Sequence, residues 1–101
     1  MKIKASWNDS ELIIAFSGEL DESNAKLARN KCDEYIDKYC LDKCIFDFRE
    51  LSFMDSTGIG VILGRYKLLK SNKRVLIIAN PCKQVMKIIK TSGMDRIIRI
   101  I

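Results

Sequence analysis

Residues 51–67 read LSFMDSTGIGVILGRYK, and the polar cluster inside this stretch decides how the whole chain is interpreted. Asp55, Ser56 and Thr57 follow a short apolar run, and the apolar residues after them recur at helical spacing. The predicted core stripe of this helix consists of Ile59, Ile62, Leu63 and Tyr66. The cluster is therefore predicted to lie at a junction between a strand and a helix.

Glycines occur at positions 58, 60 and 64 of the same helix, although a mid-helix glycine costs about 1 kcal/mol relative to alanine. Gly60 and Gly64 are four residues apart, so we expect them to share a helix face and to let the backbone approach its neighbours closely. The spacing does not complete a G-x-G-x-x-G dinucleotide fingerprint, because position 63 is leucine. No glycine precedes a lysine, as a Walker phosphate loop requires, and the chain has no histidine for a serine-hydrolase triad.

The first part of the chain is predicted to form a hairpin and a helix. Alternating apolar residues at 3–7 and 12–16 predict two strands joined by a polar turn. Gly18 is expected to end the second strand, and Asp21 or Ser23 to cap the following helix. The apolar stripe of that helix is Ala25, Ala28, Cys32, Tyr35, Ile36 and Tyr39.

The second part of the chain alternates strands and helices. KCIFDF at 43–48 and RVLIIA at 74–79 are predicted to be strands buried on both faces, and RIIRII at 96–101 a last strand. Asn80 is expected to cap a third helix that has Pro81 at its first position. That helix has an apolar stripe and a terminating glycine, namely Cys82, Val85, Met86, Ile89 and Gly93. The order β-β-α-β-α-β-α-β predicts one α/β domain with a mixed, mostly parallel sheet, an N-terminal hairpin and helices packed on the sheet.

Composition limits the class of protein. A chain of 101 residues suits one domain, and it contains neither an apolar run of membrane-spanning length nor the apolar core of a signal peptide at its start, so we expect a cytoplasmic protein without membrane contact. The cysteines are Cys32, Cys40, Cys44 and Cys82. Their spacing matches no zinc motif, so we expect buried or half-buried thiols and neither a metal nor a cofactor.

Charge is distributed unevenly along the chain. Residues 1–50 carry a net charge of −3, and residues 51–101 carry +8. Lys83, Lys87 and Lys90 are predicted to form one face of the third helix, opposite its apolar stripe. A basic face can meet nucleic acid or an acidic protein, but a solvated lysine-rich surface is the favoured interpretation.

The junction before residue 58 has two interpretations. Unpaired N–H groups and the positive end of the helix dipole favour an anion there, and a phosphate on Ser56 would add a charge of about −1.5 to −2 beside Asp55 and Asp21. Alternatively, Asp55 or Ser56 merely caps the helix. Spacing alone favours the cap.

Several motifs resemble one known family. FMDSTGIGVILGRYK resembles the signature of STAS-domain anti-sigma factor antagonists, in which Asp-Ser-Ser/Thr-Gly opens a helix. GELD at 18–21 resembles the loop after that family's second strand, and VMKIIKTSGMDRIIRI resembles its closing segment. The resemblance covers residues 1–101 as a single STAS domain, and it is strongest to the sporulation antagonists of endospore-forming bacteria.

The resemblance implies a regulatory binding module and not an enzyme. Such an antagonist, when unphosphorylated, binds an anti-sigma factor that is also a serine kinase and thereby frees the sporulation sigma factor. The kinase phosphorylates the serine after Asp, here Ser56, and a metal-dependent phosphatase reverses this step. Thr57 offers a second hydroxyl, but the Asp-Ser order favours Ser56. The residues implied to contact the partner or shape the switch are Gly18, Glu19, Leu20, Asp21, Asp55, Ser56, Thr57 and Gly58.

Three alternatives remain at the level of sequence. A general stress-response antagonist would share the fold and differ in its partners. A nucleotide-binding or weakly hydrolytic domain would use the glycine-containing turn. A nucleic-acid-binding domain would use the basic second half, and its affinity would fall steeply with salt.

Overall fold

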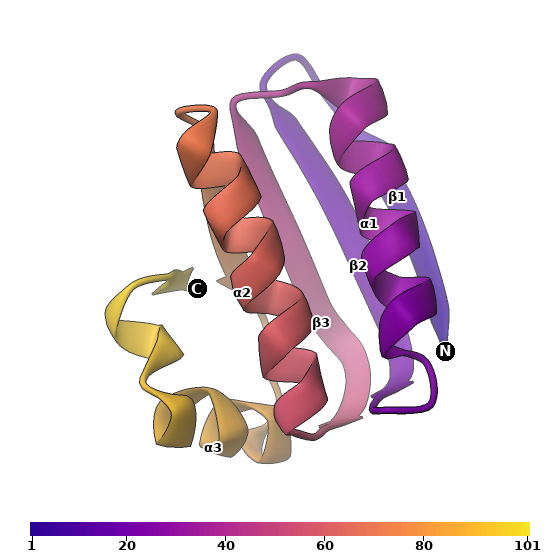
Figure 1. The fold of residues 1–101 in the computed structure, drawn as a ribbon, viewed down its shortest axis with the longest axis vertical. Coiled ribbons are helices and arrows are strands. Elements are labelled where there is room, and N and C mark those ends of the chain that lie inside the picture. The colour runs from indigo at the N-terminus through magenta and orange to yellow at the C-terminus, as the bar shows by residue number, and fades with distance from the viewer.

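A computed structural model describes residues 1–101 as one five-stranded sheet with helices packed on it (Figure 1). The elements are β1 (Lys2–Trp7), β2 (Glu11–Leu20), α1 (Ala25–Tyr39), β3 (Lys43–Met54), α2 (Ser56–Ser71), β4 (Val75–Ala79), α3 (Lys83–Ser92), the 3-10 helix η1 (Met94–Arg96) and β5 (Arg99–Ile100). The predicted order of helices and strands is confirmed, with η1 as an addition. None of the helices combines the length and apolar character needed to cross a membrane.

The strands lie in the order β1-β2-β3-β4-β5, with β1 antiparallel to β2 and every other pair parallel. Each parallel crossover moves one strand further in the same direction. Because such crossovers are right-handed, successive helices are placed on the same face of the sheet. α1 and α2 accordingly lie side by side on one face, while α3 lies near the end of the sheet where β3 ends (Figure 1).

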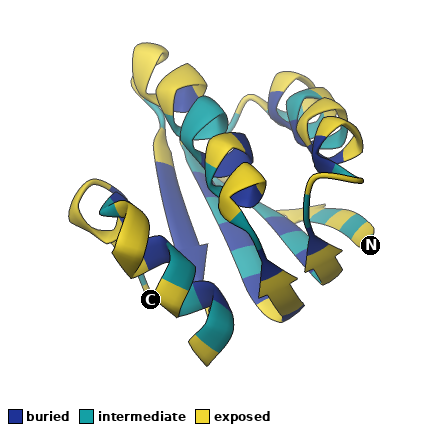
Figure 2. Cartoon of the chain, turned by 60° about the horizontal axis from the view of Figure 1, so that its bottom comes forward, coloured by how far each residue is buried: buried dark blue, intermediate teal, exposed yellow.

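The core lies between this face of the sheet and the helices (Figure 2). Phe16 of β2 packs on Phe46 and Phe48 of β3, with ring centroids 5.1 and 5.2 Å apart. Burial alternates along β2 and along residues 43–48 of β3. The prediction that 43–48 is buried on both faces is therefore wrong, since no helix covers the opposite face. The same prediction for 74–79 holds for Leu76–Ala79, which are all buried, but not for Val75, which is 51% exposed.

The segment between β2 and α1 differs from the prediction in two ways. β2 does not end at Gly18, which adopts φ +99° inside the strand, where the register with β3 shifts between Gly18 and Glu19. The N-cap of α1 is Asn24, and not Asp21 or Ser23. The Asn24 side chain crosses the loop instead of bonding the helix: it accepts from the Asp21 N–H at 3.0 Å and donates to the Glu19 carbonyl at 2.7 Å.

α2 is rotated relative to the predicted stripe. Its buried residues are Gly58, Val61, Ile62 and Leu69. Of the four predicted core residues only Ile62 is fully buried, and the others are half-exposed. The rotation follows from Gly58, because its missing side chain leaves room for the buried Met54. A Cβ added at Gly60 or Gly64 would meet nothing within 4 Å beyond the helix itself, so their expected role in close packing is wrong.

α3 begins later than the sequence predicts. Its N-cap is Cys82, and Asn80 adopts φ +59° before the helix while donating to the Asp47 carboxylate at 3.1 Å. This bond to β3 and the left-handed backbone keep Asn80 and Pro81 outside the helix. Gly93 ends α3 with φ +78°, as predicted. The last strand is shorter than predicted, because η1 occupies residues 94–96.

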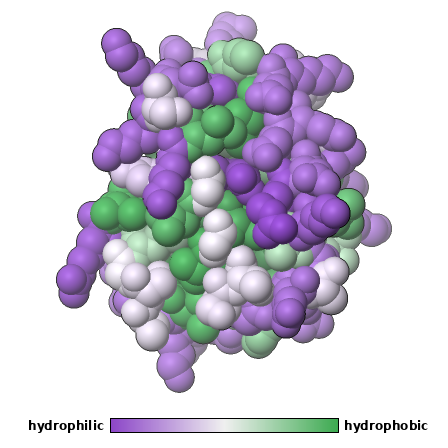
Figure 3. Space-filling model, viewed as in Figure 1, coloured by the Kyte–Doolittle hydropathy of each residue, from purple (hydrophilic) through white to green (hydrophobic).

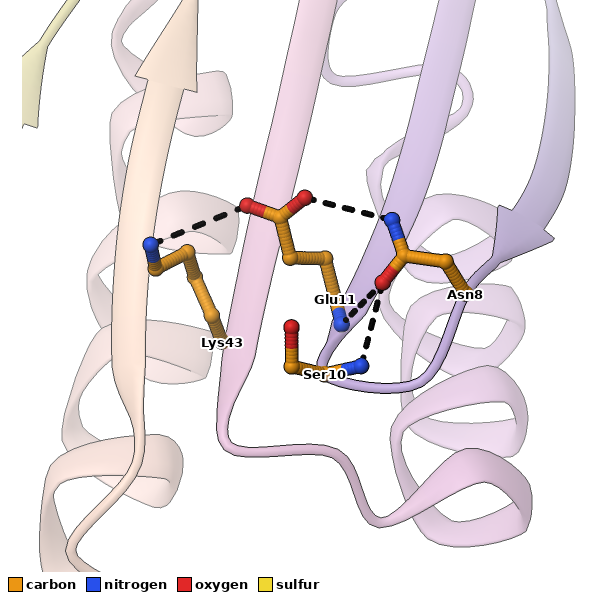
Figure 4. Close-up of polar contacts among 4 residues, drawn as sticks. All are labelled: Asn8, Ser10, Glu11 and Lys43. Atoms are coloured by element: carbon orange, nitrogen blue, oxygen red, sulfur yellow. Dashed lines mark hydrogen bonds and ion pairs between the residues drawn. The ribbon is translucent and has the colours of Figure 1, made fainter.

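The predicted turn of the hairpin is confirmed (Figure 4). Asn8 Oδ1 accepts from the backbone N–H groups of Ser10 and Glu11, at 3.0 and 2.9 Å. The Glu11 carboxylate in turn lies 3.7 Å from the Lys43 ammonium. The turn is thereby connected to the start of β3, at the end of the sheet opposite α3 (Figure 1).

All four cysteines are unpaired. Cys32 and Cys44 are buried and Cys82 is half-buried, as predicted, whereas Cys40 is exposed. Burial raises the pKa of the Cys32 and Cys44 thiols to about 12. Both therefore remain protonated at neutral pH and serve as small apolar core residues.

Substitution by alanine should lower the stability of the protein at Gly58 and raise it at Gly60 and Gly64. A Cβ at Gly58 would lie 3.0 Å from the Met54 sulfur and 3.3 Å from a Leu20 methyl, so Gly58→Ala should lower the free energy of unfolding by about 1–3 kcal/mol. Gly60→Ala and Gly64→Ala meet open space, so each should raise it by about 0.5–1 kcal/mol. Urea unfolding measures all three. Equal effects at the three positions would contradict the orientation of α2.

Candidate functional site

The two segments that carry the predicted site lie together at one end of the sheet (Figure 2). β2 and β3 are parallel and end at the same level, since Leu20 pairs with Met54. The Asp55 N–H donates to the Leu20 carbonyl at 3.3 Å. The GELD loop and the DSTG segment are therefore neighbours, although more than thirty residues separate them in the sequence.

Asp55 is the N-cap of α2, which confirms one of the two predicted caps. Its Oδ1 accepts from the Thr57 N–H at 2.9 Å, from the Gly58 N–H at 3.4 Å and from the Thr57 hydroxyl. Its Oδ2 accepts from the Glu22 N–H at 3.3 Å. One carboxylate thus joins the start of α2 to the loop before α1.

These bonds favour the charged form of Asp55. The hydrogen bond from the Thr57 hydroxyl, helped by the N–H groups of Gly58, Glu22 and Thr57, holds the pKa of the Asp55 carboxyl below its ordinary value of 3.8, against a smaller opposing effect of desolvation. The first turn of α2 therefore already holds one anion at neutral pH.

The two hydroxyls of the DSTG segment have different surroundings. Thr57 donates its hydroxyl to Asp55, so this oxygen is held against the carboxylate. Ser56 is the first residue of α2 and is exposed, and its hydroxyl forms no hydrogen bond within the domain. Only Ser56 therefore presents a free hydroxyl to a reacting partner.

The other predicted partner residues fall into two groups. Gly18 and Glu19 are exposed and Asp21 is half-exposed, whereas Leu20 and Gly58 are buried. The buried pair supports the loop from beneath. Four acidic residues lie on the two neighbouring segments, and they are called the acidic rim below: Glu19, Asp21, Glu22 and Asp55.

Sequence reasoning missed two contributors to the site. Glu22 supplies a backbone N–H to Asp55, and Gln84 of α3 bonds both backbone groups of Met54, with distances of 2.9 and 3.0 Å. Glu22 acts through its main chain, which the residue type does not indicate. Gln84 is a polar residue beside the apolar stripe of α3, and this position is the one sequence feature that could have indicated its role.

Two further surfaces lie outside this cluster. Lys83, Lys87 and Lys90 are exposed along α3, as predicted. On the face that carries the helices, apolar surface is visible between the charged side chains (Figure 3). Ile97 is 52% exposed and borders a shallow groove of about 110 Å³ between α2 and η1. The domain therefore presents both charged and apolar surface outside the cluster.

Comparisons with known proteins agree on the family. The model of the STAS domain family matches residues 2–101. An anti-sigma F factor antagonist of Paenibacillus polymyxa is 32% identical over 99% of this chain and 86% of its own length. An anti-sigma-B factor antagonist of Bacillus subtilis is 26% identical over 99% of this chain and 90% of its own length.

Solved structures show the same fold. The anti-sigma factor antagonist SpoIIAA in its unphosphorylated form superposes with a TM-score of 0.83 at 29% identity, covering 99% of this chain and 88% of the other. The phosphorylated form of the Bacillus cell fate determinant SpoIIAA superposes with a TM-score of 0.75 at 28% identity, covering 99% and 91%.

The acidity of Asp55 should depend on Thr57. In the wild-type protein the Asp55 carboxyl should titrate below its ordinary pKa of 3.8, and Thr57→Val should raise that pKa because it removes the hydroxyl donor. A native pKa below the unfolded one adds stability above the unfolded pKa, and this stability disappears as pH falls through the native pKa. The acid-induced loss should therefore be smaller in Thr57→Val. Carboxyl ¹³C NMR measures the pKa; the same value in both proteins would contradict the hydrogen-bonding account.

Proposed function

The chain belongs to the STAS domain family, in its group of anti-sigma factor antagonists, and we propose that it is an antagonist of the sporulation type. In its unphosphorylated form it binds, in the cytoplasm, an anti-sigma factor that is also a serine kinase, and this releases the sporulation sigma factor. Phosphorylation of Ser56 by that kinase ends the binding. A metal-dependent serine phosphatase restores the active form.

The observation that carries this proposal is the free hydroxyl of Ser56. It is exposed at the first position of α2, directly after the capping carboxylate of Asp55, while the neighbouring Thr57 hydroxyl is held by that carboxylate. A kinase needs a hydroxyl that can reach its phosphate donor. Of the two candidates, Ser56 meets this requirement without breaking a bond.

Two findings support the proposal, one for the phosphorylation switch and one for the sporulation type. The structural relative SpoIIAA is named in both an unphosphorylated and a phosphorylated form, as expected for a phosphorylation switch. The relative named as an anti-sigma F factor antagonist is also more similar in sequence than the one named for sigma B. The stress-response antagonist remains the second candidate, because the two groups share the whole fold.

Electrostatics explains how one phosphate can end binding. The acidic rim favours a partner with basic groups at the matching positions. A phosphate on Ser56 adds a charge of about −1.5 to −2 and considerable bulk beside Asp55. A like-charge contact in a desolvated interface can cost several kcal/mol, and each 1.4 kcal/mol lowers affinity about tenfold.

The geometry gives no support to a nucleotide-binding role for this turn. The N–H groups of Thr57 and Gly58, which would have to hold a phosphate at the start of α2, already donate to Asp55. Ser56 has no hydrogen-bonded base that could activate its oxygen. A binding module that is modified by its partner fits these contacts better than an enzyme.

The first prediction of this proposal concerns the modified residue. Incubation with the purified anti-sigma factor kinase and ATP should add one phosphate, which mass spectrometry should map to Ser56. Ser56→Ala should remain unmodified, and Thr57→Val should still accept the phosphate because the Thr57 hydroxyl is not the acceptor. Efficient labelling of Ser56→Ala would show that another residue carries the switch.

The second prediction is that the switch acts locally and leaves the fold intact. Ser56→Asp should keep the melting temperature and circular dichroism of the wild type, because the Ser56 hydroxyl has no contact to lose, yet its affinity for the anti-sigma factor should fall at least about tenfold. Ser10→Asp, which adds the same charge at the opposite end of the sheet, is the matched control and should bind normally. Unfolding of Ser56→Asp, or equal loss of affinity in both variants, would overturn the local mechanism.

A further inference from the structure

β3 extends well beyond its partner strand β4. Pairing between them stops at Asp47 and Ala79, whereas β3 continues to Met54. Along residues 48–54 the strand is paired with β2 on one side only. The backbone groups on its other edge, facing α3, therefore need partners from outside the sheet.

Gln84 supplies these partners at Met54. Its side-chain oxygen accepts from the Met54 N–H at 2.9 Å, and its side-chain nitrogen donates to the Met54 carbonyl at 3.0 Å. In a parallel sheet the N–H and C=O of one residue point to the same neighbouring strand, so the amide of Gln84 replaces the missing strand at this single residue. The half-exposed Cys82 thiol contributes a weaker contact to the Ser52 carbonyl, at 3.8 Å.

Met54 is also held from α2. Its side chain is fully buried and lies beneath Gly58, where no Cβ could be added without displacing it. Met54 is therefore fixed through its backbone by α3 and through its side chain by α2. It directly precedes Asp55, so only one residue separates this double anchor from Ser56.

We propose that Gln84 is a positioning residue for Ser56: by holding the backbone of Met54, it fixes the point from which the Asp55 cap and the Ser56 hydroxyl are directed. The inference rests on the proposed function only for its consequence in phosphorylation. Its structural part is that Gln84 keeps the hydrogen bonds of Asp55 formed, and this part stands independently of any partner.

Amide hydrogen exchange tests the structural part. Gln84→Met removes both hydrogen bonds to Met54 and keeps the side chain at nearly the same length. Gln84→Ala is a second variant that cannot introduce a clash. Exchange should accelerate at least about fivefold at Thr57, Gly58 and Glu22, the donors to Asp55, in addition to Met54, since an ordinary hydrogen bond has about this effect on an equilibrium. The matched control is Arg74→Met, which removes two side-chain bonds to the backbone, at Leu41 and Ile36, at the other end of the sheet.

Each outcome decides the question. Faster exchange at the donors to Asp55 in the Gln84 variants, absent in Arg74→Met, supports the proposal. Faster exchange at Met54 alone, or a uniform increase along the chain in all variants, overturns it, because Gln84 would then be only a local or a general stabiliser.

Phosphorylation tests the consequence. With the purified anti-sigma factor kinase at saturating concentrations of this protein and ATP, the rate for Gln84→Met should fall severalfold below the rates for the wild type and Arg74→Met. Equal rates for all three would remove the link from Gln84 to Ser56. If the wild type itself is not phosphorylated, the proposed function fails, while the exchange measurement still decides the role of Gln84.

Discussion

The hydrogen bonds of the Asp55 carboxylate are the interaction on which the site depends. One oxygen accepts from Thr57 and Gly58 at the start of α2, and the other accepts from Glu22 in the loop before α1. Hydrogen bonds to an ionised acceptor are stronger than neutral ones. Because both connections leave the sheet at adjacent strand ends, a single charge holds two segments that are distant in the sequence. The geometry around Ser56 therefore depends on an ionised Asp55.

The four residues of the DSTG segment have separate roles that follow from their positions at the start of one helix. Asp55 caps the helix, and Thr57 supplies the hydroxyl that lowers the pKa of Asp55. Gly58 faces the sheet and leaves space for Met54. Ser56 is the remaining residue, and it points to neither the core nor the cap. The polar cluster and the following glycine thus position one hydroxyl that forms no hydrogen bond inside the domain.

What the sequence predicted well were features set by local chemistry. The hairpin turn at Asn8, the cap at Asp55 and the helix end at Gly93 each depend on residues within a few positions, and the strand-helix order follows from periodicity. The errors arise where distant segments decide. The rotation of α2 depends on the fit of Gly58 over Leu20 of β2 as well as over Met54, and the start of α3 is delayed by the bond from Asn80 to β3. Neither contact leaves a periodic signal in the chain.

Asp55, Thr57 and Gly58 hold the local structure, whereas Ser56 does not. This division determines whether a modification of Ser56 changes the stability of the domain or its affinity for a partner. A modification changes an equilibrium only by as much as it interacts differently with the two states. Because the Ser56 hydroxyl forms no hydrogen bond within the domain, a phosphate there breaks no intramolecular hydrogen bond. The acidic rim, in contrast, makes added negative charge unfavourable to any partner that matches the rim. For the proposed phosphorylation of Ser56, the change in free energy therefore belongs to the complex with the partner and not to the folding of the domain.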